Sequence, residues 1–88
     1  MSTKIGNSRT NVSEDEFRER LRDLPPSAKL VAKILEIEGA LPQGRLAEES
    51  LLPDRTVRYA LNRLEDVDLV TSQYSIEDAR KQVYSLAN

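Results

Sequence analysis

Prolines and a glycine divide this chain into short segments and thereby limit the length of any helix that it can form. Pro25 and Pro26 separate two segments of helical period, Gly39 ends the second, and Pro53 precedes a later one. The residue before a proline is pushed out of the α conformation, and glycine readily takes the left-handed conformation that follows many helices. With 88 residues, the chain can form one compact domain with a modest core.

The first segment, residues 14–24, is predicted to be an amphipathic helix. Phe17, Leu21 and Leu24 share one helical face, and Ser13 precedes them at the first position of a capping box. This apolar face must be covered, either by the core of the same subunit or by a partner subunit.

Three further segments are predicted to supply the core helices. Residues 26–38 carry a broad apolar stripe, residues 43–51 allow about two helical turns, and residues 54–67 form a longer helix after Pro53, with Asp54 as its cap. The residues expected to face inward are Leu30, Val31, Ile34, Leu35 and Ile37 in the first, Leu46, Ala47 and Leu51 in the second, and Val57, Ala60, Leu61, Leu64 and Val67 in the third.

The end of the chain is predicted to form a β-hairpin. Residues 69–75 and 82–87 are rich in β-branched and aromatic residues and flank a charged loop, and Val83 and Leu86 are expected to face the core. The order of elements predicts a mainly α fold with a small β-hairpin over residues 13–88. This is a winged helix-turn-helix, with a three-helix core plus wing and an extra N-terminal helix.

Composition excludes most enzyme chemistry. The chain has no cysteine and no histidine, so it lacks thiol nucleophiles and the commonest general base and metal ligand. It also has no glycine-rich phosphate loop, and we therefore expect no enzyme activity, no metal and no cofactor. Residues 1–12 are polar and without period, which predicts a flexible tail. No stretch resembles a secretory signal or a membrane span, so the expected location is cytoplasmic.

The stretch from Leu52 to Val70, LPDRTVRYALNRLEDVDLV, resembles the helix-turn-helix and following strand of MarR-like winged-helix transcriptional regulators, especially small archaeal ones. The matching residues are Pro53, Thr56-Val57, Leu61 with Leu64, and Leu69-Val70. The resemblance covers about Ser27 to Leu86, and it departs at Asp68, where the family usually has a left-handed glycine. It implies sequence-specific DNA binding, usually as a dimer, with the helix at 54–67 in the major groove and the hairpin as the wing.

The helix at 54–67 carries side chains that suit a DNA groove. Arginine can bond guanine, and asparagine adenine, through paired hydrogen bonds, which makes Arg58 and Asn62 the candidate base contacts. Arg55 and Thr56 lie in the first turn, where they can hold a phosphate. The other candidate DNA-binding residues are Arg45, Tyr59, Arg63, Arg80 and Lys81. The alternative is that these cations only solubilise a surface helix and pair with neighbouring acids.

The formal net charge of −2 leaves a second function open, because DNA-binding domains are often basic. A winged helix can serve as a protein–protein interaction module without binding DNA. In the DNA interpretation the partners are double-stranded DNA and a second copy of the chain, a homodimer that Phe17, Leu21 and Leu24 of the first helix could form.

Overall fold

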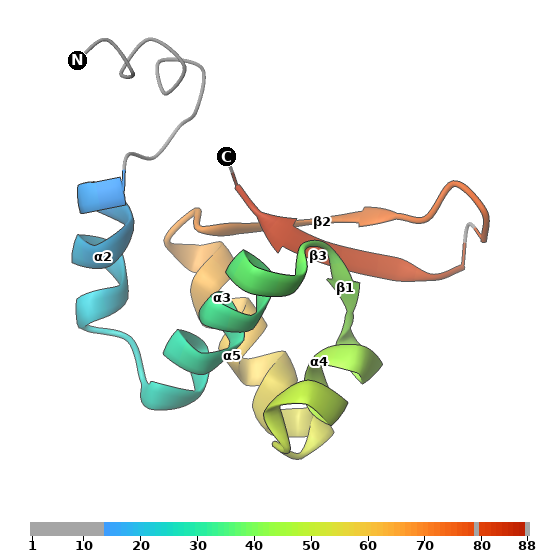
Figure 1. Ribbon diagram of the computed structural model, residues 1–88, viewed down its shortest axis with the longest axis horizontal. Helices are drawn as coiled ribbons and strands as arrows, with labels where there is room; N and C mark the ends of the chain where they lie inside the picture. Colours follow the sequence, from blue (N-terminus) through green and yellow to red (C-terminus); the bar gives the residue numbers. More distant parts are fainter. Residues whose placement is uncertain (1–13, 79, 88) are drawn as a thin grey trace, which may run out of the picture.

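A computed structural model describes residues 14–78 and 80–87 of the chain. Within these residues, four helices and three strands follow one another in winged-helix order (Figure 1). The elements are α2 (Glu14–Arg22), α3 (Pro26–Glu38), β1 (Leu41–Pro42), α4 (Gln43–Ser50), α5 (Asp54–Asp66), β2 (Val70–Tyr74) and β3 (Gln82–Leu86). The predicted mainly α fold with a small sheet is confirmed. The predicted tail at 1–12 and the capping residue Ser13 lie outside the described residues.

The strands form one antiparallel sheet in the order β1-β3-β2. The register pairs Leu41 with Tyr84 and Val70 with Leu86, so the two-residue strand β1 before α4 joins the hairpin as an edge strand. Tyr84 and Leu86 pack against the core, whereas Val83 is not among the core-packed residues. The prediction for Leu86 is confirmed and that for Val83 is wrong, because residues three apart in a strand point to opposite faces.

The core lies between α3, α4, α5 and the inner face of the sheet. The buried side chains come from every one of these layers, and α3 packs mainly against α5. The buried apolar residues are Leu24, Ala28, Val31, Ala32, Leu35, Leu46, Val57, Ala60, Leu61, Leu64, Leu69 and Val70. Full burial of one leucine stabilises a fold by about 1.5–3 kcal/mol, so this cluster fixes the position of α5 in the domain.

Three residues predicted to face inward are exposed. Leu30 and Ile37 on α3 are 40% and 72% exposed. The buried side of this helix is centred on Ala28 and Ala32, and Leu30 and Ile37 lie at the edge of the apolar stripe that is farthest from those two alanines. Leu51 is 89% exposed, because α4 ends at Ser50 and Leu51 turns into the left-handed conformation with φ 63°.

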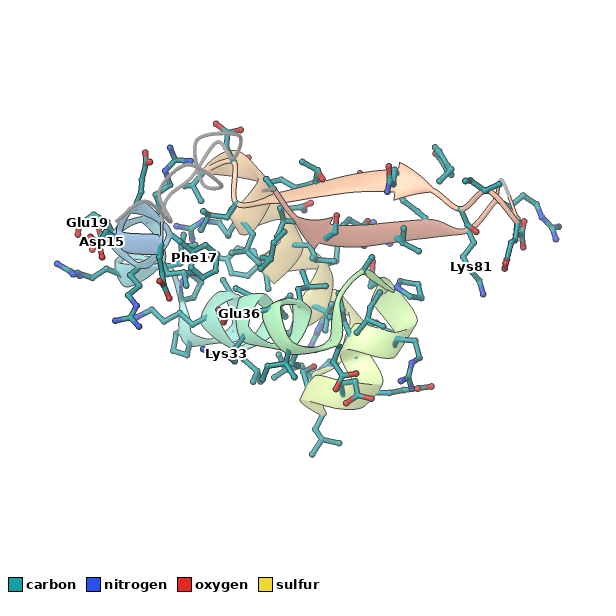
Figure 2. All side chains as sticks on the ribbon, turned by 45° about the horizontal axis from the view of Figure 1, so that its top comes forward. Asp15, Phe17, Glu19, Lys33, Glu36 and Lys81 are labelled. Carbon is teal, nitrogen blue, oxygen red and sulfur yellow. The ribbon has the colours of Figure 1, made fainter. Side chains whose placement is uncertain are left out.

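The N-terminal helix α2 packs against the core of its own subunit. It ends at Arg22, two residues earlier than predicted, and Leu24 lies buried in the turn that leads to α3. Phe17 and Leu21 are partly buried against the same core, and Figure 2 shows Phe17 on the side of α2 that faces the domain. Arg20 adds a polar tie, since its Nη1 donates a 2.8 Å hydrogen bond to the carbonyl oxygen of Val67 after α5.

Candidate nucleic-acid interface

The turn between α4 and α5 is held by hydrogen bonds from both sides. The buried Ser50 accepts the main-chain N–H of Leu52 on its Oγ at 3.2 Å, and the same hydroxyl lies 3.5 Å from the carbonyl oxygen of Ala47. Gln43, the first residue of α4, donates from Nε2 to the carbonyl oxygen of Asp54 at 3.2 Å. These contacts fix α5 against α4, as a helix-turn-helix requires. Sequence reasoning missed Ser50 and Gln43.

The start of α5 differs in detail from the prediction. Pro53 is the residue that caps the helix, and no side chain makes a capping hydrogen bond there. Asp54 is therefore the first residue inside the helix, and the prediction that it caps α5 is wrong. Its carboxylate still lies in the first turn, where it faces the positive end of the helix dipole.

The structure brings the candidate residues of α5 together on one exposed face. Arg55, Arg58, Tyr59 and Asn62 are exposed, and Thr56 lies beside them, half-buried. The opposite face of the helix carries Val57, Ala60, Leu61 and Leu64, all buried. The helix is thus anchored along one side and presents polar side chains along the other, so their relative positions are fixed by a single rigid element.

Ion pairing divides the candidate cations into two groups. Arg45 on α4 bonds both Glu48 and Glu49, each at 3.1 Å, and Arg80 in the wing loop lies 3.4 Å from Asp78. Within residues 14–78 and 80–87, Arg55 and Arg58 take part in no ion pair. The uncompensated positive charge of the helix-turn-helix therefore lies on the exposed face of α5.

Arg63 has a different partner from the other arginines. Its Nη1 donates a 2.8 Å hydrogen bond to the hydroxyl oxygen of Tyr59, one turn earlier on α5. Its guanidinium carbon lies 5.8 Å from the centroid of the Tyr59 ring, within the range of a cation–π contact. The two side chains therefore form one unit on α5.

The hairpin projects from one side of the helices as a wing, and α2 lies on the opposite side (Figure 1). Lys81 lies directly before β3, at the loop end of the wing and away from the helices (Figure 2), and its carbonyl oxygen accepts the N–H of Ser75 at 2.7 Å. The same loop carries Glu77 and Asp78, so the wing has little net charge. Its Ile76 is fully exposed.

The part of the chain that the structure describes contains neither a candidate metal site nor a candidate membrane span. No group of three or more acidic, histidine or cysteine residues there is arranged to hold a metal ion. No helix of those residues is long and apolar enough to cross a lipid bilayer.

Of the comparisons with known proteins, the one with solved structures identifies the fold. No protein-family model and no curated protein matches the chain. Solved structures do match: the transcriptional regulator PA4135 is 25% identical with a TM-score of 0.68, over 80% of this chain and 53% of its own. The zinc-responsive MarR family member ZitR from Lactococcus lactis is 24% identical with a TM-score of 0.65, over 89% and 46%. An S. aureus MepR mutant bound to an oligodeoxyribonucleotide is 18% identical with a TM-score of 0.67, over 96% and 61%.

The chain therefore has the winged helix-turn-helix fold of MarR-like transcriptional regulators, and the resemblance seen in the sequence is confirmed. It spans about half the length of the solved structures that it matches. The narrower likeness to small archaeal members finds no support in these structures.

Proposed function

We propose that this protein binds double-stranded DNA in a sequence-specific manner and regulates transcription, with α5 in the major groove. The proposal is carried by the exposed face of α5, where Arg55 and Arg58 have no ion pair among the described residues and stand beside Asn62. Solved structures of the same fold are named as transcriptional regulators, and one of them was solved bound to DNA. A major groove admits an α-helix that presents such side chains.

The side chains of α5 divide between base contacts and phosphate contacts. Arg58 and Asn62 lie one turn apart on the exposed face, which a helix in the groove turns toward base edges. Arg55 and Thr56 lie in the first turn, close to the free main-chain N–H groups that favour a phosphate. We assign specificity to the first pair and affinity to the second.

Arg45 and the wing make weaker contributions in this proposal. Arg45 must exchange Glu48 and Glu49 for a phosphate, but exposed ion pairs contribute only about 0–1 kcal/mol, so the exchange costs little. In the wing, Arg80 is held by Asp78, which leaves Lys81 as the better candidate for a contact with the adjacent groove or backbone.

A homodimer on a two-fold symmetric operator belongs to the proposal. The half-sites would then lie about one helical turn, or a multiple of it, apart. The apolar face of α2 is covered by the core of its own subunit, so Phe17 and Leu21 have little area left for a second copy. Symmetry in the selected DNA tests the dimer independently of where its contact lies.

The experiment is selection of bound sequences from a random duplex pool, followed by titration of the selected duplex at several salt concentrations. Each phosphate contact contributes about 0.9 to the slope of log K against log salt, so the Arg55→Ala, Arg58→Ala double variant should lower the slope by up to about 1.8. The control is Arg18→Ala, Arg22→Ala on α2, which removes the same charge from exposed positions away from α5 and should leave the slope unchanged.

The single variant Arg58→Ala separates a base contact from a phosphate contact. If Arg58 reads a base, its loss costs about 1–3 kcal/mol on the selected duplex and relaxes the preference at one base pair. Equal weakening on every duplex would mean that Arg58 contacts a phosphate and not a base. An unenriched pool, with no binding even at low salt, would refute DNA binding altogether.

Exposed apolar residues favour one second candidate, a protein-interaction module. Ile76 at the wing and Ile37 on α3 each present a large apolar side chain to solvent, and contact with a partner protein would bury them. This function becomes the better account only if the duplex selection fails.

A further inference from the structure

The contact between Tyr59 and Arg63 leaves the two side chains with different hydrogen-bonding capacity toward a ligand. The Tyr59 side chain is exposed, and its hydroxyl oxygen already accepts a hydrogen bond from Arg63. A phenol has one O–H, and that proton must point away from the donor that its oxygen accepts. The Tyr59 hydroxyl is therefore free to donate outward, toward whatever approaches the exposed face of α5.

The position of Arg63 makes it a poor independent contact. Its side chain is only half-buried, yet one of its N–H groups bonds Tyr59 and its guanidinium lies against the aromatic ring. A guanidinium held over a ring loses less conformational entropy when a ligand binds, but it is turned toward the phenol rather than toward the groove. Donation to the phenol oxygen also polarises the O–H and strengthens it as a donor.

We propose that Arg63 is a positioning residue for DNA binding: it holds the Tyr59 phenol so that the Tyr59 hydroxyl donates to a DNA phosphate oxygen. This inference rests on the proposed function, and it gives Arg63 an indirect role in place of the direct DNA contact that the sequence predicts for it. A phosphate is the fitting acceptor because its charged oxygens strengthen a hydrogen bond from the polarised O–H, and tyrosine hydroxyls commonly donate to phosphates in protein–DNA complexes. Tyr59 is exposed on the same face of α5 as Arg55, so both side chains can reach the DNA backbone. The alternative is a helical i,i+4 pair that only stabilises α5 by a few tenths of a kcal/mol.

The test is a double-mutant cycle on the duplex selected from the random pool. We expect Tyr59→Phe and Arg63→Ala each to weaken binding about tenfold, the loss of one hydrogen bond to a charged group. The double variant should also lose about tenfold rather than a hundredfold, because the two residues act through the same hydroxyl. Arg63→Lys, which can still donate to the phenol, should recover part of the loss.

Salt dependence separates positioning from direct contact. Arg63→Ala should leave the slope of log K against log salt unchanged, whereas the matched variant Arg55→Ala should lower it by about 0.9. A fall of about 0.9 for Arg63→Ala, with losses that multiply in the double variant, would show a direct phosphate contact and overturn the inference. Unchanged affinity for both single variants would overturn it as well, by leaving the pair with a structural role alone.

A measurement without DNA keeps this inference distinct from the proposed function. The ¹³Cζ chemical shift of Tyr59, observed by NMR in the free protein, should move in Arg63→Ala and stay close to the wild-type value in Arg63→Lys. If wild-type protein selects no duplex, the proposed function fails and this inference fails with it. If wild-type protein binds DNA but the ¹³Cζ chemical shift of Tyr59 does not change in Arg63→Ala, only the positioning role of Arg63 fails.

Discussion

Replacing Leu51 with glycine should stabilise the protein, because the backbone of Leu51 is left-handed and its exposed side chain contributes little to the free energy of unfolding. It directly follows α4 with φ 63°, the conformation in which helices commonly end with glycine. Its side chain is 89% exposed, so truncation removes almost no burial. The left-handed conformation costs an L-residue roughly 1–2 kcal/mol through the contact of Cβ with the following carbonyl.

The expected gain follows from two opposing terms. Replacing Leu51 with glycine removes the steric cost of roughly 1–2 kcal/mol, and the greater freedom of glycine in the unfolded chain returns about 0.5–1 kcal/mol. The net stabilisation is about 0.5–1 kcal/mol. For a domain of this size, that raises the melting temperature by about 2–8 °C.

Thermal and urea unfolding of three variants isolate the backbone term. Leu51→Gly should be more stable than wild type, and Leu51→Asn should lie between them, since asparagine tolerates the left-handed region better than leucine. Leu51→Ala keeps the Cβ and should stay within about 0.5 kcal/mol of wild type. Ile37→Gly, which also removes an exposed apolar side chain but at a right-handed position in the last turn of α3, should be destabilising by up to about 1 kcal/mol. A Leu51→Gly variant no more stable than Leu51→Ala would refute the strain argument.

Three further changes test the contacts that hold α5 in place, each measured as the free energy of unfolding in urea. Ser50→Ala leaves a main-chain N–H in the turn without its acceptor and should cost about 1–3 kcal/mol; no change would mean that water replaces the hydroxyl. Leu61→Ala opens a cavity at a fully buried position and should cost about 2–5 kcal/mol, and a cost below 1 would mean that the core collapses around it. Arg20→Ala removes the hydrogen bond to Val67 and should cost about 1 kcal/mol, while Arg22→Ala, exposed on the same helix, should cost less than 0.5; equal costs would deny the bond a role.

The element order was predictable because local backbone constraints set it. Pro25, Gly39 and Pro53 act within one or two residues of their own positions, and each stands at a helix boundary in the structure. The left-handed conformation of Asp68, with φ 60°, agrees with the resemblance in the sequence, which implies a left-handed residue at that position. Constraints that are local in the chain leave a local sign in the sequence.

The errors arose where three-dimensional context decides. The apolar stripe of α3 is wider than the core that it meets, so periodicity alone could not tell that Ile37 would stay exposed. The contact of Arg20 with Val67 joins residues 47 positions apart and leaves no sign in either neighbourhood. Val83 is a different kind of error, since strict alternation along β3 would have chosen Tyr84 instead.

The division among the candidate cations was partly readable from spacing. Glu48 and Glu49 follow Arg45 by three and four residues, the helical spacing of an ion pair, and Arg63 follows Tyr59 by four. Such spacing shows which side chains can meet. Which of them do meet depends on the packing of the whole helix-turn-helix.

These pairings set how strongly a protein of net charge −2 can hold DNA. In the proposed function Arg55 and Lys81 are the charged phosphate contacts, and each would add about 0.9 to the slope of log K against log salt, or about 1.8 for each subunit. Strongly electrostatic DNA-binding proteins reach slopes near 10. On the proposed function, one subunit would therefore have too little electrostatic affinity to occupy DNA at random, and we expect binding to depend on base contacts by Arg58 and Asn62 together with a second subunit. A slope well above about 4 for a two-fold symmetric complex would mean that further cations contact phosphates, either Arg58 or the ion-paired Arg45 and Arg80.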